Sequence, residues 1–458
     1  MSQTNNLKYE KKTVYEKAGE KIVAEAYEYA KGYVKFLDAA KTEREAVIES
    51  VRIAENAGYR PYTFGQPIKA GDKLYYNNRG KNIFLFRIGT EPIDNGIRIT
   101  AAHLDSPRLD LKQVPIYEDN GMCFFKTHYY GGIRKYQWLA LPLALHGVVI
   151  KQSGEVVNIT IGENESDPVM YITDLLPHLA SKEVAKTVKE AFSAEKLNIL
   201  IGSKPLEGTE KSSVKMGILN YLWDTYGITE EDFLSAELCL VPAGKARDVG
   251  LDRSMICAYG HDDRVCAYPS LTAFIDADES IHTTMCLLVD KEETGSDGVT
   301  GMQSSLITDI ITEISKALGA NEALVRANSK CLSSDVTATF YPNFSDVYEH
   351  QNSSLLGCGI IICKYTGSGG KGGTSDASAE LVAWVRRCFN EAGVVWQTSE
   401  LGKVDAGGGG TIAKFMAKHN IDTVDTGVGV LSMHAPFEVI SKVDLYESYR
   451  AFRAFYHF

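Results

Sequence analysis

TTMCLLVDKEET, residues 283–294, is the stretch that decides the fold class of this 458-residue chain. Its first seven residues are β-branched or apolar, which is typical of a short buried strand. A charged turn follows at once and contains Asp290, Glu292 and Glu293. In open α/β sheets, ligands bind beyond the carboxyl ends of the strands. The stretch therefore predicts a buried strand with candidate site residues at its end.

The same alternation of strand-like run, polar turn and helix-like run continues to the end of the chain. Near the N-terminus, residues 15–57 have helical spacing, and GIRITAAHLDSPRL (96–109) is a β-rich run that leads into a polar turn. This alternation predicts an α/β fold in which helices sandwich a sheet. Further strand-like runs lie at 356–365, 394–398 and 423–433, and helix-like runs at 304–319, 378–393, 411–419 and 442–456.

Residues 112–241 have a different texture, in which short strand-like runs are joined by glycine turns. One core is not expected to hold a chain of this length. Because the α/β pattern lies on both sides of the β-rich region, the simplest division is one α/β domain made of residues 1–111 and 242–458. A β-rich domain over 112–241 is then inserted into it.

The composition excludes several classes of protein. With 48 Lys and Arg against 59 Asp and Glu, the formal net charge is −11, which argues against a general nucleic-acid binder. Nine cysteines, an odd number, disfavour a disulfide framework and favour a reducing cytoplasm. The N-terminal residues are polar, and the longest apolar run, 139–150, is too short to span a bilayer. We therefore expect a soluble cytoplasmic protein.

Five polar clusters lie at or just beyond the ends of predicted strands. Each has a plain structural alternative when taken alone. Asp262 and Asp263 suit a helix N-cap, adjacent glutamates are commonly exposed, and a lone histidine is more often structural than a metal ligand. The clusters are His103-Leu104-Asp105, His261-Asp262-Asp263-Arg264, Asp290 to Gly295, Ser333-Ser334-Asp335 and Ser432-Met433-His434.

Taken together, the clusters favour a metal centre. Two histidines and at least three carboxylates are donors that suit Zn²⁺ or Mn²⁺. Three of them satisfy a single zinc ion, whereas five ligands and a spare carboxylate fit two metals with a bridging Asp and a Glu as general base. The chain lacks a G-x-S-x-G motif, which disfavours a serine hydrolase. The set is most consistent with metal-assisted hydrolysis of an amide.

Two glycine-rich stretches, GSGGKGGTS (367–375) and AGGGGT (406–411), superficially suggest phosphate-binding loops. The first fails the P-loop pattern, because Gly372 rather than Ser or Thr follows Lys371. Tight turns are the simpler interpretation of both stretches. Lys371 can still meet an anionic group in a nearby pocket.

Five motifs follow one another along the chain: AAHLDSPRLDLK (101–112), HDDR (261–264), DKEETGS (290–296), SSDVTATFYPN (333–343) and VGVLSMHAP (428–436). With them the chain resembles the aspartyl aminopeptidase and vacuolar aminopeptidase I family of dinuclear zinc exopeptidases. The resemblance covers nearly the whole chain. It implies a zinc exopeptidase-like catalytic domain with a mixed sheet, peptide substrates, and an inserted domain used for dimerisation within a homo-dodecamer.

The resemblance also implies two Zn²⁺ per subunit, for which Mn²⁺ or Co²⁺ can substitute. Glu292 would act as the general base and then as the proton donor to the leaving amine. His103 and Asp335 would hold one ion, and Glu293 and His434 would hold the other. Asp262 would bridge the two ions. Asp105 would orient His103.

Some residues depart from the family pattern. Asp263, where Asn is usual, leaves the metal site intact, and Ala435 to Glu438 replaces the sequence Ser-Ile-Arg-Glu. His178 is the candidate for a histidine that the inserted domain supplies to a neighbouring active site. Lys364 and Lys371 are candidates to bind an acidic N-terminal side chain, although both can equally be exposed loop lysines.

The N-terminal residue preference, acidic or neutral, therefore stays open, and two other functions compete with the aminopeptidase. A metal-dependent deacylase or carboxypeptidase-like amidase would use the same ligands. A non-catalytic cage protein is disfavoured by the intact Glu292-Glu293 pair, since a decayed site would most readily lose its base.

Overall fold

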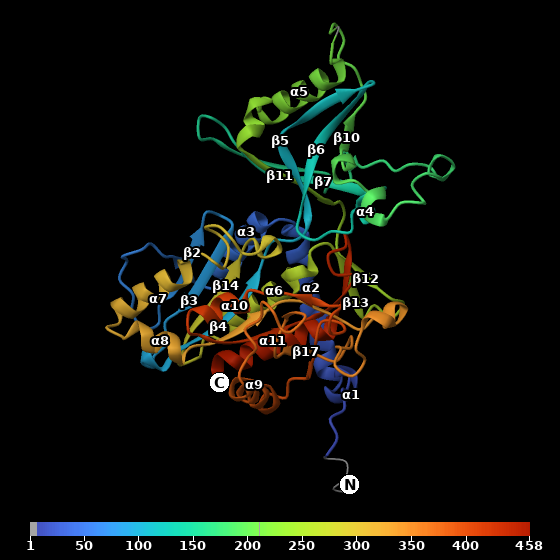
Figure 1. The fold of residues 1–458 in the computed structure, drawn as a ribbon. Helices are drawn as coiled ribbons and strands as arrows, with labels where there is room; N and C mark the ends of the chain where they lie inside the picture. Colours follow the sequence, from blue (N-terminus) through green and yellow to red (C-terminus); the bar gives the residue numbers. More distant parts are fainter. Residues whose placement is uncertain (1–6, 210) are drawn as a thin grey trace. The chain divides into compact units, whose positions relative to one another are not determined.

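A computed structural model describes residues 7–209 and 211–458, which form two compact units. Unit 1 comprises the described residues up to Asp105 together with Ala246–Met433 and Glu438–Phe458. Unit 2 comprises Ser106–Lys245 and His434–Phe437. Most of unit 2 is coloured from cyan to green in Figure 1.

A nine-stranded sheet forms the centre of unit 1. Its four middle strands run parallel to one another, and the strands on either side of them run antiparallel, so the sheet is mixed. The predicted α/β fold with a mixed sheet is confirmed. The strand order is β1 (Arg60–Pro61), β2 (Lys73–Asn78), β3 (Asn82–Arg87), β14 (Thr283–Val289), β4 (Ile97–His103), β15 (Lys330–Ser334), β21 (Asp422–Gly427), β17 (Ile360–Cys363) and β19 (Trp396–Thr398).

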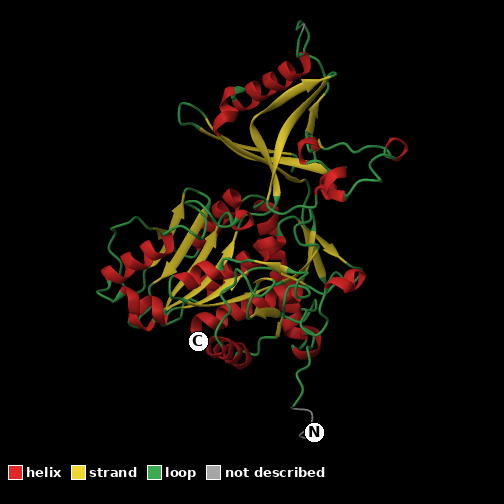
Figure 2. Cartoon of the chain, viewed as in Figure 1, coloured by secondary structure: helices red, strands yellow, loops and turns green. Residues whose placement is uncertain are grey.

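Helices cover both faces of this sheet (Figure 2). Alternate residues of β3 separate the two cores, because Ile83 and Leu85 join one apolar cluster while Phe84 and Phe86 join the other. The first core is covered by α2 (Glu20–Ala39), α3 (Glu43–Asn56), α6 (His261–Asp276), α9 (Ala379–Glu391) and α11 (Lys442–His457), and the second by α7 (Leu306–Ala317), α8 (Glu322–Asn328) and α10 (Ala413–Lys418). The short α1 (Val14–Lys17) precedes them.

Unit 1 also contains a second sheet of five strands, in the order β12 (Arg247–Val249), β13 (Met255–Ala258), β23 (Glu438–Ser441), β22 (Gly429–Leu431) and β16 (Thr337–Ala338). The single strand predicted over 423–433 is wrong, since it breaks between β21 and β22, which belong to different sheets. Gly427, the last residue of β21, permits the close approach of the Asp335 backbone, because a Cβ there would lie 1.8 Å from the carbonyl oxygen of Asp335.

The seven strands of unit 2 form one sheet in the order β11 (Ala236–Pro242), β5 (Arg108–Asp119), β6 (Met122–Tyr130), β10 (Ile199–Gly202), β9 (Met170–Tyr171), β7 (Pro142–Ile150) and β8 (Val156–Ile161). Strand β11 also pairs with β7, so the sheet closes on itself. The unit's α-helices are α5 (Ser213–Tyr226) and the single turn α4 (Val188–Ala191). The charged stretch 181–192 has helical composition, but its α-helix, α4, is a single turn that begins only after Thr187, which forms a capping box with Glu190.

Two global expectations can be compared with the described residues. All nine cysteines are free thiols. In the described parts of the chain, no helix combines the length and the apolar character that crossing a membrane requires.

Candidate metal centre

His103 is the last residue of β4, and its side chain is 1% exposed. Its Nδ1 lies 2.9 Å from the carbonyl oxygen of Asp105. A carbonyl can only accept a hydrogen bond, so Nδ1 carries the proton and Nε2 is left as a potential metal-binding atom. This contact fixes both the tautomer and the orientation of the ring.

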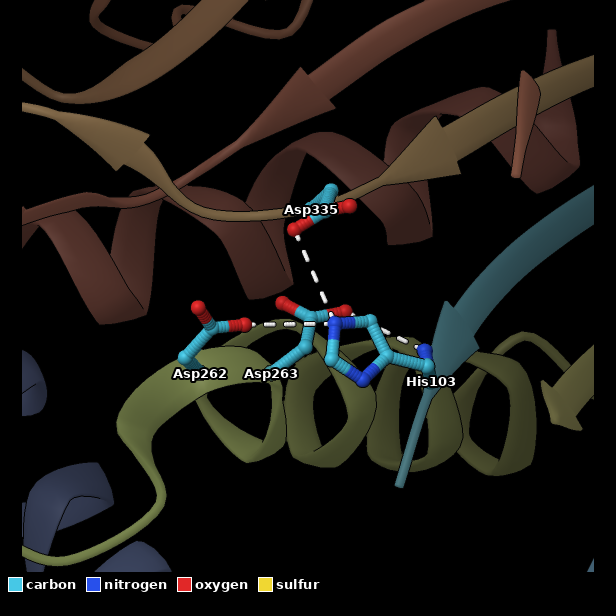
Figure 3. A group of neighbouring side chains, drawn as sticks. All are labelled: His103, Asp262, Asp263 and Asp335. Atoms are coloured by element: carbon cyan, nitrogen blue, oxygen red, sulfur yellow. Dashed lines mark hydrogen bonds and ion pairs between the residues drawn. The ribbon is translucent and has the colours of Figure 1, made fainter. Parts of the chain in front are cut away.

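Three carboxylates surround the Nε2 atom of His103. Asp262 Oδ1 lies 3.2 Å from it, Asp335 Oδ1 3.8 Å and Glu292 Oε2 4.0 Å. Figure 3 shows Asp262 and Asp335 directed at the ring from two different elements. One donor atom from each of His103, Asp262, Asp263 and Asp335 fits within a cluster whose members lie within 4.8 Å of one another.

The sheet register explains why residues so distant in sequence meet. Val289, at the end of β14, pairs with His103, and Ser333, near the end of β15, pairs with Ala101. The turns that follow these neighbouring parallel strands leave the sheet at one edge. Glu292 and Asp335 lie in those turns, as the sequence predicted for the ends of the two strands.

Asp105 is fully buried beside this cluster. Its Oδ1 accepts the backbone N–H of Glu292 and its Oδ2 that of Glu293, each at 3.1 Å. Oδ1 also lies 3.3 Å from His103 Nδ1. Asp105 therefore contacts both the histidine and the short 3₁₀ turn Glu292–Thr294.

Asp262 and Asp263 lie at the start of α6 with non-helical backbone angles, and their carboxylates lie near His103 (Figure 3). The Asp263 Oδ2 atom accepts the backbone N–H of His103 at 3.2 Å. The Asp262 N–H donates to Glu438 Oε2 at 2.9 Å. The sequence suggested Asp263 only as a helix N-cap, whereas the N-cap residue is Gly260, and it gave Glu438 no role. Two features of the sequence mark these residues: Asp263 directly follows Asp262, and Glu438 lies four residues after His434.

The crowded carboxylates perturb one another. Burial, followed by the charge of Asp335, raises the pKa of Glu292 to about 8. Burial also raises the pKa values of Asp263 and Asp335. For His103, burial lowers the pKa, but the contacts with Asp105, Asp262 and Asp335 outweigh it and the net shift is upward. Each shift reflects an excess of negative charge in a buried space.

A divalent cation fits this donor set. The lone pair of His103 Nε2 faces an oxygen of Asp262 at 3.2 Å, an acceptor-to-acceptor contact that needs a proton or a cation between the atoms. An imidazole nitrogen with carboxylate oxygens is a ligand combination that zinc favours. A cation would also offset the excess negative charge of the surrounding carboxylates.

His434 follows β22 and belongs to unit 2. Its Nδ1 lies 2.7 Å from the carbonyl oxygen of Gly132. With Nδ1 in this contact, Nε2 is the ring nitrogen that can bind a metal. Its predicted role as a ligand stays a prediction. His178 lies exposed in the short 3₁₀ turn Pro177–Leu179 of the same unit, and its predicted role also stays a prediction.

Lys364 and Lys371 both form ion pairs with the carboxylate of Asp376. The Lys371 ammonium also lies 3.7 Å from the ring centre of Tyr365. The phenol of Tyr365 donates a hydrogen bond to Glu400. Tyr365, Lys371 and Glu400 line a small pocket together with residues of the two glycine-rich segments. Those segments pair with each other as the two-residue strands β18 (Gly367–Ser368) and β20 (Gly408–Gly409).

Comparison with known proteins adds independent support for the sequence resemblance. A family model described as aminopeptidase I zinc metalloprotease (M18) matches residues 36–456. A relative from Clostridium acetobutylicum named "Probable M18 family aminopeptidase 1" is 48% identical, over 98% of this chain and 99% of the relative. The crystal structure of an M18 family aminopeptidase from Thermotoga maritima matches with a TM-score of 0.94 at 44% identity, covering 98% of this chain and 100% of that one.

A more distant structure, the Saccharomyces cerevisiae mApe1 dodecamer, shares the fold at 20% identity, with a TM-score of 0.77 over 93% of this chain and 96% of that one. The family predicted from the five sequence motifs is confirmed. The chain belongs to the M18 family of aminopeptidase I zinc metalloproteases, and it is an aminopeptidase.

Proposed function

We propose that the chain removes the N-terminal residue from peptides at a centre of two zinc ions per subunit. The observation that carries this proposal is the convergence of Asp262, Asp335 and Glu292 within 4.0 Å of the His103 Nε2 atom. The assignment gives one ion to His103 and Asp335, the other to Glu293 and His434, with Asp262 shared between them. Mn²⁺ or Co²⁺ substitutes for Zn²⁺ in this arrangement.

Bound zinc supplies Lewis acidity to the centre. The chain's own residues supply the proton transfers. Glu292 accepts the proton of the attacking water on a carboxylate oxygen and later delivers it to the nitrogen of the departing amine. Asp105 holds the backbone on either side of Glu292 through two amides, so the base stays in one orientation. Asp105 also fixes the tautomer of His103.

The assembly that fits the family fold is a homo-dodecamer built from dimers, with unit 2 in the dimer contact. The distant mApe1 structure is a dodecamer, which motivates the proposal for this chain. Light scattering after gel filtration tests the assembly directly. A particle of twelve chains is expected, and a mass of one or two chains would overturn this part of the proposal.

The activity test uses aminoacyl-p-nitroanilides of Asp, Glu, Leu and Lys with Zn²⁺, Mn²⁺ or Co²⁺, together with N-acetylated versions of each substrate. Metal-dependent release is expected from free-amine substrates alone. A deacylase would instead release acetate from the acetylated substrates and leave the anilide bond intact. Acetate release without p-nitroaniline release from any free-amine substrate would overturn the aminopeptidase mechanism. The four substrates also rank the N-terminal preference.

Glu292→Gln tests the base separately. The variant keeps the size of the side chain but cannot accept the proton, so kcat should fall by roughly 10²- to 10⁴-fold. Its zinc content should equal that of the wild type, because Glu292 is not among the proposed ligands. Undiminished activity in the variant would sink the assignment of Glu292.

A further inference from the structure

Two carboxylates outside the proposed ligand set hold the backbone amides of proposed ligand residues. Glu438, which is 1% exposed, accepts the N–H of Asp262 at 2.9 Å. Asp263, which is fully buried, accepts the N–H of His103 at 3.2 Å. Burying a carboxyl group is unfavourable unless its oxygens receive hydrogen bonds, and each of these side chains receives one from the amide that it holds.

The Asp262 amide depends on an acceptor outside its own helix. Asp262 has φ −78° and ψ 103°, and Asp263 has φ −118° and ψ 23°, so the first turn of α6 is not helical there. An amide at a helix start also has no partner within the helix. The Glu438 side chain therefore supplies what the local backbone does not.

The register of the five-stranded sheet brings Glu438 to this amide. Ala258 at the end of β13 pairs with Glu438 at the start of β23. Only Tyr259, Gly260 and His261 separate Ala258 from Asp262. Glu438 thus lies beside the strand that leads directly into the Asp262 turn.

We propose that Glu438 is a positioning residue that holds the Asp262 carboxylate in place for zinc before the metal binds, and that Asp263 does the same for His103. This inference rests on the proposed function, because it takes Asp262 as the bridging ligand. A turn that is already ordered pays no ordering entropy when the metal arrives. Loss of a residue that orients a ligand typically weakens metal affinity by about 10- to 100-fold.

Three substitutions separate the hydrogen bond from the charge. Glu438→Gln keeps an acceptor oxygen at the same reach without the charge. Glu438→Asp keeps the charge but shortens the side chain by one methylene group. Glu438→Met keeps the length and removes the acceptor.

Glu447→Met is the matched control. Glu447 is a fully buried glutamate of α11 whose Oε2 accepts the backbone N–H of Val395 at 2.7 Å, away from the proposed ligand set. The control removes a buried carboxylate-to-amide contact within the same unit, together with the ion pair between Glu447 and Arg450. It should lower stability without changing zinc affinity.

Zinc affinity is measured on the full chain by competition with a chelating dye, and amide hydrogen exchange of residues 259–265 is followed in the metal-free protein. Glu438→Gln should bind zinc within about threefold of the wild type. The Asp and Met variants should bind about 10- to 100-fold more weakly and exchange faster at 259–265.

Equal zinc affinity in all three Glu438 variants, or the same loss in the Glu447 control, would overturn the inference. If Glu438→Met does not fold, the Gln and Asp variants still test the inference. Weak zinc binding by Glu438→Gln together with wild-type zinc binding by Glu438→Asp would also contradict it, because the charge rather than the position of the acceptor would then matter. Zinc binding by the wild-type chain is measured first. A wild-type chain that binds no zinc would refute the proposed function rather than the role of Glu438.

Discussion

Asp105 accepts the backbone amide of Glu293 through its Oδ2 atom at 3.1 Å, across 188 residues of sequence. Its other oxygen accepts the amide of Glu292, so both oxygens are engaged. Asp105→Asn replaces one acceptor with an NH₂ group that cannot receive an N–H. We expect zinc affinity to fall by about 10- to 100-fold, with a matching loss in kcat/KM at limiting zinc.

Asp110→Asn is the control for this change, because Asp110 pairs with Arg108 on β5 of unit 2. Zinc titration by chelator competition measures both variants. Wild-type affinity in Asp105→Asn would show that the two amide contacts do not shape the centre.

Gly427→Ala should disrupt the centre through sterics alone. The added Cβ would lie 1.8 Å from the carbonyl oxygen of Asp335, so the backbone that carries this proposed ligand must shift. We expect a loss of about 3 kcal/mol or more in the free energy of unfolding, together with weaker zinc binding. Gly370→Ala is the control, since a Cβ there meets nothing within 4 Å. Chemical denaturation of both variants decides the matter.

Asp376→Asn tests whether Lys364 and Lys371 bind the substrate. Asp376 forms ion pairs with both ammonium groups, so it offsets part of their positive charge. If the lysines bind an acidic N-terminal residue, the variant should lower KM for an Asp substrate by roughly two- to fivefold and leave a Leu substrate unchanged. Lys371→Met should act in the opposite direction. Parallel changes for Asp and Leu substrates would remove the lysines from substrate binding.

Asp444 should make stability depend on pH. Its oxygens accept the amides of Gly357 and Gly359, and burial raises the pKa of this carboxyl to about 7. Since the folded-state pKa lies above the ordinary value of 3.8, the stabilisation is complete below about pH 4 and is lost as the pH rises through 7.

The comparison with Asp444→Asn isolates this effect, because Asn does not titrate. The stability advantage of the wild type over the variant should shrink by up to about 4 kcal/mol between pH 4 and pH 8. Denaturant titrations of both proteins at each pH measure it. An advantage that grows with pH would contradict the direction of the shift.

The parts of the centre that follow strands could be predicted from the sequence. His103 ends β4, and Glu292 and Asp335 come soon after β14 and β15, as the pattern of apolar run and charged turn indicated. These strands are parallel neighbours, so their ends share one edge of the sheet. Local pattern and general sheet geometry are sufficient for this part.

Other features depend on pairings between distant segments. Glu438 reaches Asp262 only because β23 pairs with β13 in one register, which no local pattern encodes. The close approach of Asp335 to Gly427 is also a contact between segments far apart in sequence. The pairing of Lys364 and Lys371 with Asp376 likewise depends on how one loop folds back.

The inserted unit also has a consequence for the order of folding. Strand β4 ends just before the chain enters Ser106–Lys245, and β13 and α6 follow it, so unit 1 must form across this long segment. Closing an unstructured loop of about 140 residues costs about 4 kcal/mol of chain entropy. However, Leu109 pairs with Leu240, so the insertion joins its own two ends. Once folded, it behaves as a short connection, and early folding of the insertion should speed assembly of the residues around His103.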